Sequence, residues 1–292
     1  IEPSTVGSSS GISKSFEQQI RFGDVPMTLH LGILQTDSVL EPLQPRFGDY
    51  PNMFEALFRA EDSTMTFTTY DVQRCLPQHL DCDAYLITGC KLSVYDDLAW
   101  IRELADFVGR VIAAKKKILG ICFGHQLIAH FFGGRAGAAE AGWGVGVQTC
   151  DLLHSEPWMQ RLGRLPSKLR LVSSHKDQVL TLPDGARVFA SSDFCPISGF
   201  TIGSEVLTIQ GHPELSPDYS RALLEVRREL LGETVYRAGL ESLVEGTDSQ
   251  LFTRWMLSFI SESVVSENSS VAWSAHHGLS LIHISEPTRR YS

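Results

Sequence analysis

The segment KKKILGICFGHQLIAHFFGG (115–134) has the pattern of a reactive cysteine. A buried-strand pattern leads into Gly120-Ile121-Cys122-Phe123-Gly124, and a helical pattern follows at once. This is a cysteine version of the nucleophile elbow, in which flanking glycines allow a sharp strand-to-helix turn. We expect Cys122 at a helix N-terminus, where the helix dipole favours the thiolate, with the amide of Phe123 facing a developing oxyanion. A buried structural cysteine is the alternative for this motif alone.

A second segment, EVLTIQGHPELSPDY (205–219), contains a histidine and a carboxylate at a useful spacing. Pro213 biases His212 towards an extended conformation, in which residues two apart project to the same side. Glu214 can then orient the His212 imidazole while the ring faces the sulfur of Cys122. The three residues would supply the nucleophile, the acid–base group and its orienter. A structural histidine is the alternative for this segment alone, and the two segments together disfavour it.

Alternating strand and helix patterns in the first half of the chain must position these groups. Short apolar runs bounded by turn residues predict strands at 29–35, 65–70, 84–88 and 116–121. Apolar residues at helical spacing predict helices at 51–60 and 96–115. This alternation predicts an α/β fold with an open, mostly parallel sheet flanked by helices.

The second half of the chain predicts shorter strands, some of them antiparallel. These strands are expected at 145–150, 168–174, 186–192 and 205–210, and a closing helix at 217–231. The glycine-rich run 142–146 lacks the spacing of a phosphate-binding loop, so we interpret it as the entry to a strand.

The two ends of the chain differ in composition from the middle. Residues 1–26 are rich in Ser, Gly and Gln, and we expect a disordered N-terminal arm. Residues 263–292 lose apolar periodicity and are expected to be a disordered or non-native tail. A single domain is predicted over 27–262.

Composition excludes several classes of protein. The 292 residues carry 25 basic and 34 acidic side chains, and the resulting net charge of −9 argues against a nucleic-acid partner. No apolar run is long enough to cross a bilayer, and the first residues lack the apolar core of a secretory signal. The six cysteines form no CxxC pair and have no histidine at zinc-ligand spacing, so no metal site is expected. Reduced thiols and a cytoplasmic location are predicted.

At this point the chain resembles a known family, the class I (triad) glutamine amidotransferases. GICFGHQ is similar to the family's nucleophile motif, and QGHPE is similar to its His–Glu motif. The resemblance covers roughly residues 29–235. It implies a flavodoxin-like sheet, with Cys122 as nucleophile, His212 as general base and acid, and Glu214 as its partner.

The resemblance also implies roles for residues around the nucleophile. Gln126 falls at a position that helps to hold the substrate glutamine. LITGCKLSVYDD (86–97) is similar to the family's oxyanion strand, although Gly89-Cys90 replaces a pair of glycines and Lys91 replaces a proline. Gly89, Cys90 and Phe123 would then supply the oxyanion amides. SSHKDQV (173–179) is similar to a segment near the glutamine pocket, which would bring Ser174, His175 and Asp177 to the pocket wall; a simple turn between strands is the alternative.

The function implied is cleavage of a γ-glutamyl amide bond through a Cys–His–Glu triad and a γ-glutamyl thioester, without a metal or an organic cofactor. Within the family, the free-standing branch is the most similar, and it includes stand-alone glutaminase-like proteins and γ-glutamyl peptidases. The expected partner is a small γ-glutamyl substrate. Two alternatives remain: a glutaminase subunit that delivers ammonia to a separate synthetase chain, and a non-catalytic binding protein with the same fold.

Overall fold

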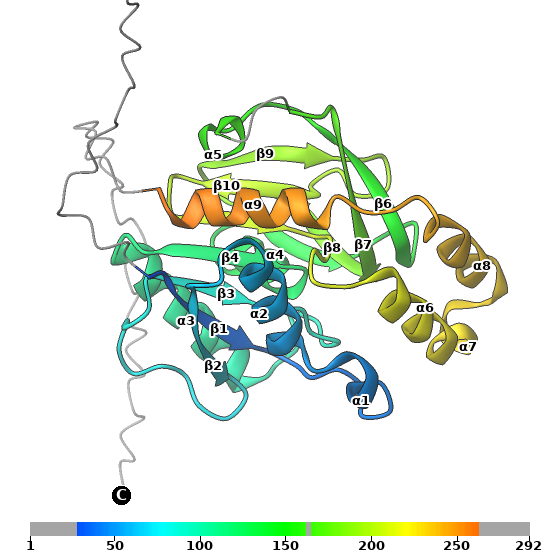
Figure 1. Cartoon of the computed structure of the whole chain (residues 1–292), viewed down its shortest axis with the longest axis horizontal. Helices are drawn as coiled ribbons and strands as arrows, with labels where there is room; N and C mark the ends of the chain where they lie inside the picture. The colour runs from blue at the N-terminus through cyan, green and yellow to red at the C-terminus, as the bar shows by residue number, and fades with distance from the viewer. Residues whose placement is uncertain (1–27, 162–164, 263–292) are drawn as a thin grey trace, which may run out of the picture. The chain divides into compact units, whose positions relative to one another are not determined.

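A nine-stranded sheet is the largest element of the computed structural model, which describes residues 28–161 and 165–262 (Figure 1). Its strands, in their order across the sheet, are β2 (Thr66–Asp71), β1 (His30–Gln35), β3 (Ala84–Ile87), β4 (Lys117–Ile121), β11 (Val206–Ile209), β10 (Gly199–Ile202), β9 (Ala186–Ser191), β6 (Gly144–Leu152) and β7 (Lys168–His175). A separate two-stranded sheet pairs β5 (Arg135–Ala138) with β8 (Asp177–Thr181).

The sheet has a parallel half and an antiparallel half. Strands β2, β1, β3, β4 and β11 run parallel to one another. From β11 onwards, each of β10, β9, β6 and β7 pairs antiparallel with the strand before it in the sheet. Parallel neighbours need long crossover connections, and helices supply most of those in the first half of the chain. The predicted fold class, including the antiparallel strands of the second half, is confirmed.

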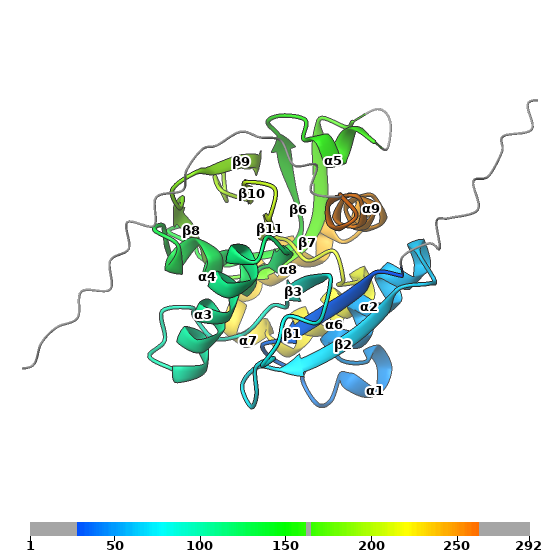
Figure 2. The same cartoon turned by 90° about the vertical axis from the view of Figure 1, so that its left-hand side faces the viewer.

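Helices cover both faces of the parallel half. The helices of the described residues are α1 (Gln44–Phe47), α2 (Tyr50–Glu61), α3 (Ala99–Ala113), α4 (Phe123–Phe131), α5 (Pro157–Gln160), α6 (Pro217–Val226), α7 (Arg228–Leu231), α8 (Glu233–Ser242) and α9 (Ser249–Ile260), and four of them cover the parallel half. Helices α2 and α9 lie on one face, and α3 and α4 lie on the other (Figures 1 and 2). The active-site candidates lie where the parallel strands end between these layers.

Side chains of each central strand point alternately to the two faces of the sheet and so contribute to a hydrophobic core on each face. In β3, Leu86 packs with Phe54 of α2 and Trp255 of α9, whereas Ile87 packs on the opposite face with Phe107 of α3. Successive side chains of a strand point to opposite faces, so a strand with helices on both sides is apolar throughout. This explains why consecutive apolar residues, rather than alternating ones, predicted the strands at 84–88 and 116–121.

The chain beyond residue 217 differs from the prediction of one closing helix. The helix over 217–231 is interrupted at Arg227, which separates α6 from α7. Helices α8 and α9 then follow, so 217–231 does not close the fold. Helix α9 buries an apolar stripe that includes Phe252, Trp255 and Phe259, a spacing that the sequence also contains.

The described residues up to Ser261 form one compact unit. The predicted arm (1–26) and tail (263–292) lie outside the described residues, so the predicted domain boundaries stay predictions.

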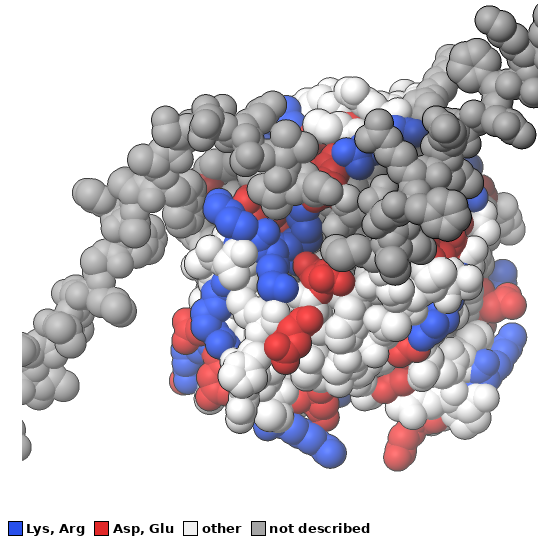
Figure 3. Space-filling model, turned by 60° about the vertical axis from the view of Figure 1, so that its left-hand side comes forward, with Lys and Arg blue, Asp and Glu red and all other residues white. Residues whose placement is uncertain are grey.

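On the face shown in Figure 3, Lys and Arg side chains lie among Asp, Glu and uncharged residues. In the part of the chain that the structure describes, no helix combines the length and the apolar character needed to span a membrane.

Candidate active site

Cys122 lies in the sharp turn between β4 and α4, in a backbone conformation that is rare for a side-chain-bearing residue. Its φ is 50° and its ψ is −95°. Such a conformation costs on the order of 1–3 kcal/mol and persists only where surrounding contacts impose it. Here the Cys122 amide donates to the carbonyl of Ile209 at 2.9 Å, and its carbonyl accepts from the amide of Gln126 at 3.0 Å. The elbow predicted from the sequence is therefore present.

Steric contacts explain why both flanking positions of the elbow are glycine. A Cβ on Gly120 would lie 2.9 Å from the carbonyl carbon of Gly124, and one on Gly124 would lie 2.7 Å from Cβ of Ile87. Carbon atoms normally approach to about 3.5–4.0 Å. Only glycine lets the first turn of α4 pack this closely against β3 and β4.

His212 and Glu214 form a buried pair directly after β11. His212 Nδ1 lies 2.7 Å from Glu214 Oε1, and the His212 amide donates to the carbonyl of Val172 at 2.8 Å. Because β11 pairs parallel with β4, the carboxyl ends of both strands meet at one edge, which brings His212 towards Cys122. The pairing of these two strands therefore places Cys122 and His212 on the wall of one cavity.

The charge state of His212 follows from its surroundings. Burial alone lowers its pKa, but the negative charge of Glu214, then that of Cys122, together with hydrogen bonds to both, raise the pKa to about 10. The ring is therefore an imidazolium at neutral pH. A cation in this position favours a thiolate beside it and can protonate a departing amine.

Gln210 is a site residue that the sequence analysis missed. Its Nε2 donates to the sulfur of Cys122 at 3.4 Å, and its Oε1 accepts from Gln126 Nε2 at 3.2 Å. The signal was present, because Gln210 stands two residues before His212 in an extended stretch and so projects to the same side. Gln126 also donates to the carbonyl of Asp177 at 2.7 Å, so its amide group holds Gln210 and the β7–β8 turn in place.

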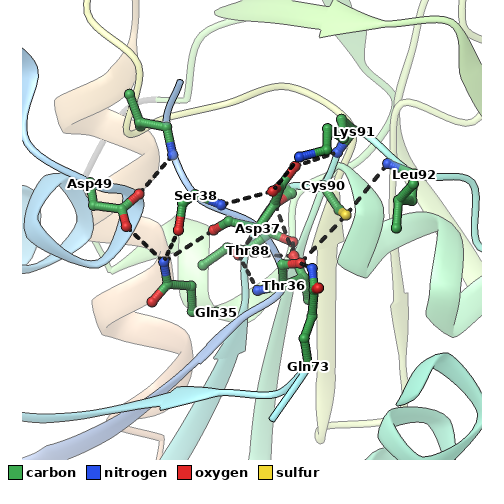
Figure 4. A network of polar contacts seen from close by, with 12 residues as sticks. Gln35, Thr36, Asp37, Ser38, Asp49, Gln73, Thr88, Cys90, Lys91 and Leu92 are labelled. Carbon is green, nitrogen blue, oxygen red and sulfur yellow. Dashed lines mark hydrogen bonds and ion pairs between the residues drawn. The ribbon is translucent and has the colours of Figure 1, made fainter. Parts of the chain in front are cut away.

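The loops after β1 and β3 are joined by a network of polar contacts (Figure 4). The Thr36 hydroxyl donates to the carbonyl of Gly89 at 2.8 Å. The Asp37 carboxylate accepts from both the amide and the Nζ of Lys91, each at 3.1 Å. The amide and the side chain of Lys91 thus tie the loop after β3 to the loop after β1.

Gly89 lies against the imidazole of His212. A Cβ at position 89 would lie 2.8 Å from His212 Cε1, which leaves no room for a side chain. Next to it, burial raises the pKa of the Cys90 thiol to about 12, so this second cysteine stays protonated at neutral pH.

Residues 174–177 were predicted to form either a pocket wall or a turn between strands. In the structure they form a turn that also lines a cavity. β7 ends at His175 and β8 begins at Asp177. His175 Nδ1 donates to the carbonyl of Asp177 at 3.0 Å, and the Ser93 hydroxyl donates to the Asp177 carboxylate. Burial lowers the pKa of His175 to about 4, so this histidine is neutral beside the charged His212. Ser174 accepts a hydrogen bond from Arg227 at 2.8 Å.

One cavity of about 440 Å³ collects most of the predicted site residues. Its wall includes Gly89, Cys90, Cys122, Gln126, Ser174, His175, Asp177 and His212. Glu214 lies behind His212, with its side chain fully buried, and Phe123 begins α4 and stacks on Trp100. The volume is typical of sites for small organic ligands. Over residues 28–161 and 165–262, no cluster of His, Cys, Asp and Glu could hold a metal ion.

These features define an α/β protein with a cysteine at a strand-to-helix elbow and a His–Glu pair after the neighbouring strand. A model of the family described as glutamine amidotransferase class-I matches residues 55–225, more than half of the chain. The chain therefore belongs to the class I glutamine amidotransferase family, as the motifs predicted.

Individual relatives extend this result. Gamma-glutamyl peptidase 3 of Arabidopsis thaliana is 34% identical over 185 residues, which are 61% of this chain and 74% of that protein. One of the subunits of the glutamine-hydrolysing GMP synthase of Pyrococcus abyssi is 38% identical over 120 residues, 40% of this chain and 61% of that protein. The crystal structure of a glutamine amidotransferase from Thermotoga maritima matches with a TM-score of 0.66 at 17% identity, over 80% of this chain and 99% of that one, and this likeness concerns the fold.

Proposed function

We propose that this protein hydrolyses γ-glutamyl amide bonds, in glutamine, γ-glutamyl amides or γ-glutamyl peptides, with Cys122 as the nucleophile. The observation that carries the proposal is the buried His212–Glu214 pair, joined at 2.7 Å, in which His212 lines the same cavity as Cys122. Similarity to γ-glutamyl peptidases supports the choice of the bond.

The first half of the reaction forms a thioester. The Cys122 thiolate attacks the carbonyl carbon of the γ-carboxamide, and the carbonyl electrons move onto oxygen. Amides of Phe123 and of Cys90 or Gly89 stabilise this oxyanion, and losing one such donor typically costs about 10²–10³ in rate. The oxyanion collapses, the C–N bond breaks, and His212 transfers its proton to the departing amine, a contribution of roughly 10²–10⁴.

The second half regenerates the enzyme. Neutral His212 takes a proton from water as the water attacks the γ-glutamyl thioester. The C–S bond breaks, glutamate leaves, and the thiolate–imidazolium pair is restored. Glu214 keeps the ring oriented in both halves. Gln126, His175 and Asp177 are proposed to contact the glutamyl part, and Ser174, the hydrogen-bond partner of Arg227, is also proposed to contact the substrate. No metal or organic cofactor takes part in this scheme.

A Cys122→Ala variant tests the proposal. We expect it to release no glutamate from a panel of glutamine, γ-glutamyl amides and γ-glutamyl peptides, while its circular-dichroism spectrum and melting temperature stay close to those of the wild type. Substantial turnover by this variant would eliminate Cys122 as the nucleophile. A wild-type protein that is inactive towards the whole panel would refute the hydrolase itself.

The second candidate is a glutaminase subunit of a two-chain amidotransferase. One relative of this chain is a subunit of a glutamine-hydrolysing GMP synthase. Glutaminase activity would then be weak in this chain alone and would rise when a synthetase chain is added. We also propose a cytoplasmic location, since all six cysteines, each within the described ranges, are free thiols.

A further inference from the structure

The cavity extends well past the nucleophile, to a wall formed by the helices that follow His212. Leu223 of α6, Arg227 at the α6–α7 junction and Leu230 of α7 line this side, together with Trp143 from the loop before β6. We name these four residues the α6–α7 wall. Ammonia, the leaving group of glutamine, needs no such surface.

Arg227 is the one cation of this wall, and its charge faces the cavity. Its Nη1 donates to the Ser174 hydroxyl at 2.8 Å, and its guanidinium lies over the Trp143 ring at 5.9 Å from the centroid. Neither contact neutralises the charge, and no carboxylate of the described residues forms an ion pair with it. The next residue, Arg228, differs, because its guanidinium pairs with Glu233 outside the cavity.

The chemistry of the bond cleavage decides which half of a substrate meets this wall. The group that protonates the leaving nitrogen must lie within hydrogen-bond reach of it, so the leaving half lies on the side of His212. From His212 the chain runs through Leu215 into α6, and Arg227 follows the last residue of that helix. Gln126 and Asp177 belong instead to α4 and β8, and α6 and α7 lie to one side of α4 (Figure 1).

We propose that Arg227 binds a carboxylate on the leaving half, so that the preferred substrates are γ-glutamyl peptides with a free C-terminal carboxylate. This rests on the proposed γ-glutamyl hydrolase activity and narrows it. A guanidinium can form two parallel hydrogen bonds with a carboxylate. The Trp143 ring, which lies beside the Arg227 guanidinium, would restrain the orientation of the guanidinium plane. Leu223 and Leu230 would contact the apolar part of the leaving amino acid or dipeptide.

The experiment compares matched pairs of substrates. γ-Glutamylalanine and γ-glutamylalanylglycine are each assayed as the free acid and as the C-terminal carboxamide, by release of glutamate. For at least one pair we expect the wild type to favour the acid in kcat/KM by about tenfold or more, the usual effect of hydrogen bonds to a charged group. In Arg227→Gln this acid-to-amide ratio should fall to about one, and Arg227→Lys should restore part of it.

Arg228→Gln is the matched control, since it removes an adjacent arginine that does not line the cavity, and it should keep the wild-type ratio. A wild-type ratio near one for both pairs would overturn the assignment. So would an Arg227→Gln variant that slows acid and amide equally, because Arg227 would then serve the glutamyl half or the fold.

Measuring substrate binding without turnover tests the role of Arg227 independently of the proposed hydrolase activity. Calorimetry on Cys122→Ala, with Arg or Gln at position 227, measures the affinity for the acid and the amide without turnover. Acid-selective binding that depends on Arg227 would support the assignment even if the wild type hydrolyses nothing, which would refute the proposed function alone. Equal affinity of acid and amide would refute the role of Arg227.

Discussion

Gly89→Ala is the most direct test of the geometry around His212, because it adds one methyl group at a known contact. The added Cβ would lie 2.8 Å from His212 Cε1. Two carbons normally approach to about 3.5–4.0 Å, so the imidazole must retreat by roughly 0.7–1.2 Å. A misplacement of about 1 Å costs on the order of 10²-fold in rate. The backbone at Gly89 does not have a positive φ, so alanine itself introduces no strain there.

The assay is steady-state release of glutamate, read together with the melting temperature. We expect kcat/KM of Gly89→Ala to fall about 100-fold with the fold retained. Gly109→Ala is the matched control, because its added Cβ lies in α3 with its nearest neighbour at 4.0 Å. It should leave the rate unchanged and raise stability by about 0.5–1 kcal/mol, the usual gain of alanine over glycine in a helix. If Gly89→Ala keeps a third or more of the wild-type rate, the position of the His212 ring does not limit catalysis and the proposed mechanism is wrong.

Two further changes test the charge of the pair and the packing of the elbow. Glu214→Gln removes the main cause of the raised pKa of His212, which is about 10 in the wild type, so the alkaline fall of kcat/KM should move to lower pH. Identical alkaline limbs in the two pH profiles would contradict this. Gly124→Ala places a Cβ 2.7 Å from Cβ of Ile87, so we expect it to lower the free energy of unfolding by about 1–3 kcal/mol, measured by urea denaturation. An unchanged urea midpoint would show that α4 can move away from β3.

The parallel half of the sheet was predictable because local patterns and tertiary structure agree there. The runs at 84–88 and 116–121 contain consecutive apolar residues, as expected for a strand covered on both faces, and both form buried strands. β10 was not predicted, since Gly199–Ile202 is a short strand whose two antiparallel neighbours define it. α9 was missed although its apolar spacing is helical, because the helix predicted over 217–231 was taken to close the fold.

The nucleophile motif and the His–Glu pair were readable because each is local. Steric and conformational rules at Gly120, Cys122 and Gly124 act over a few residues, and so does the alternation that brings Glu214 beside His212. These rules predicted the elbow and the pair without knowledge of the rest of the chain.

Contacts between distant segments could be decided only by the tertiary structure. The pairing of β4 with β11 brings His212 towards Cys122, and the Gln210 donor reaches the sulfur across 88 residues of sequence. Likewise, the crossing of α6 over the antiparallel strands directs Arg227 towards Ser174, 53 residues away. Sequence spacing fixes which side of its own strand a residue occupies, but strand order and helix packing fix which residue it faces.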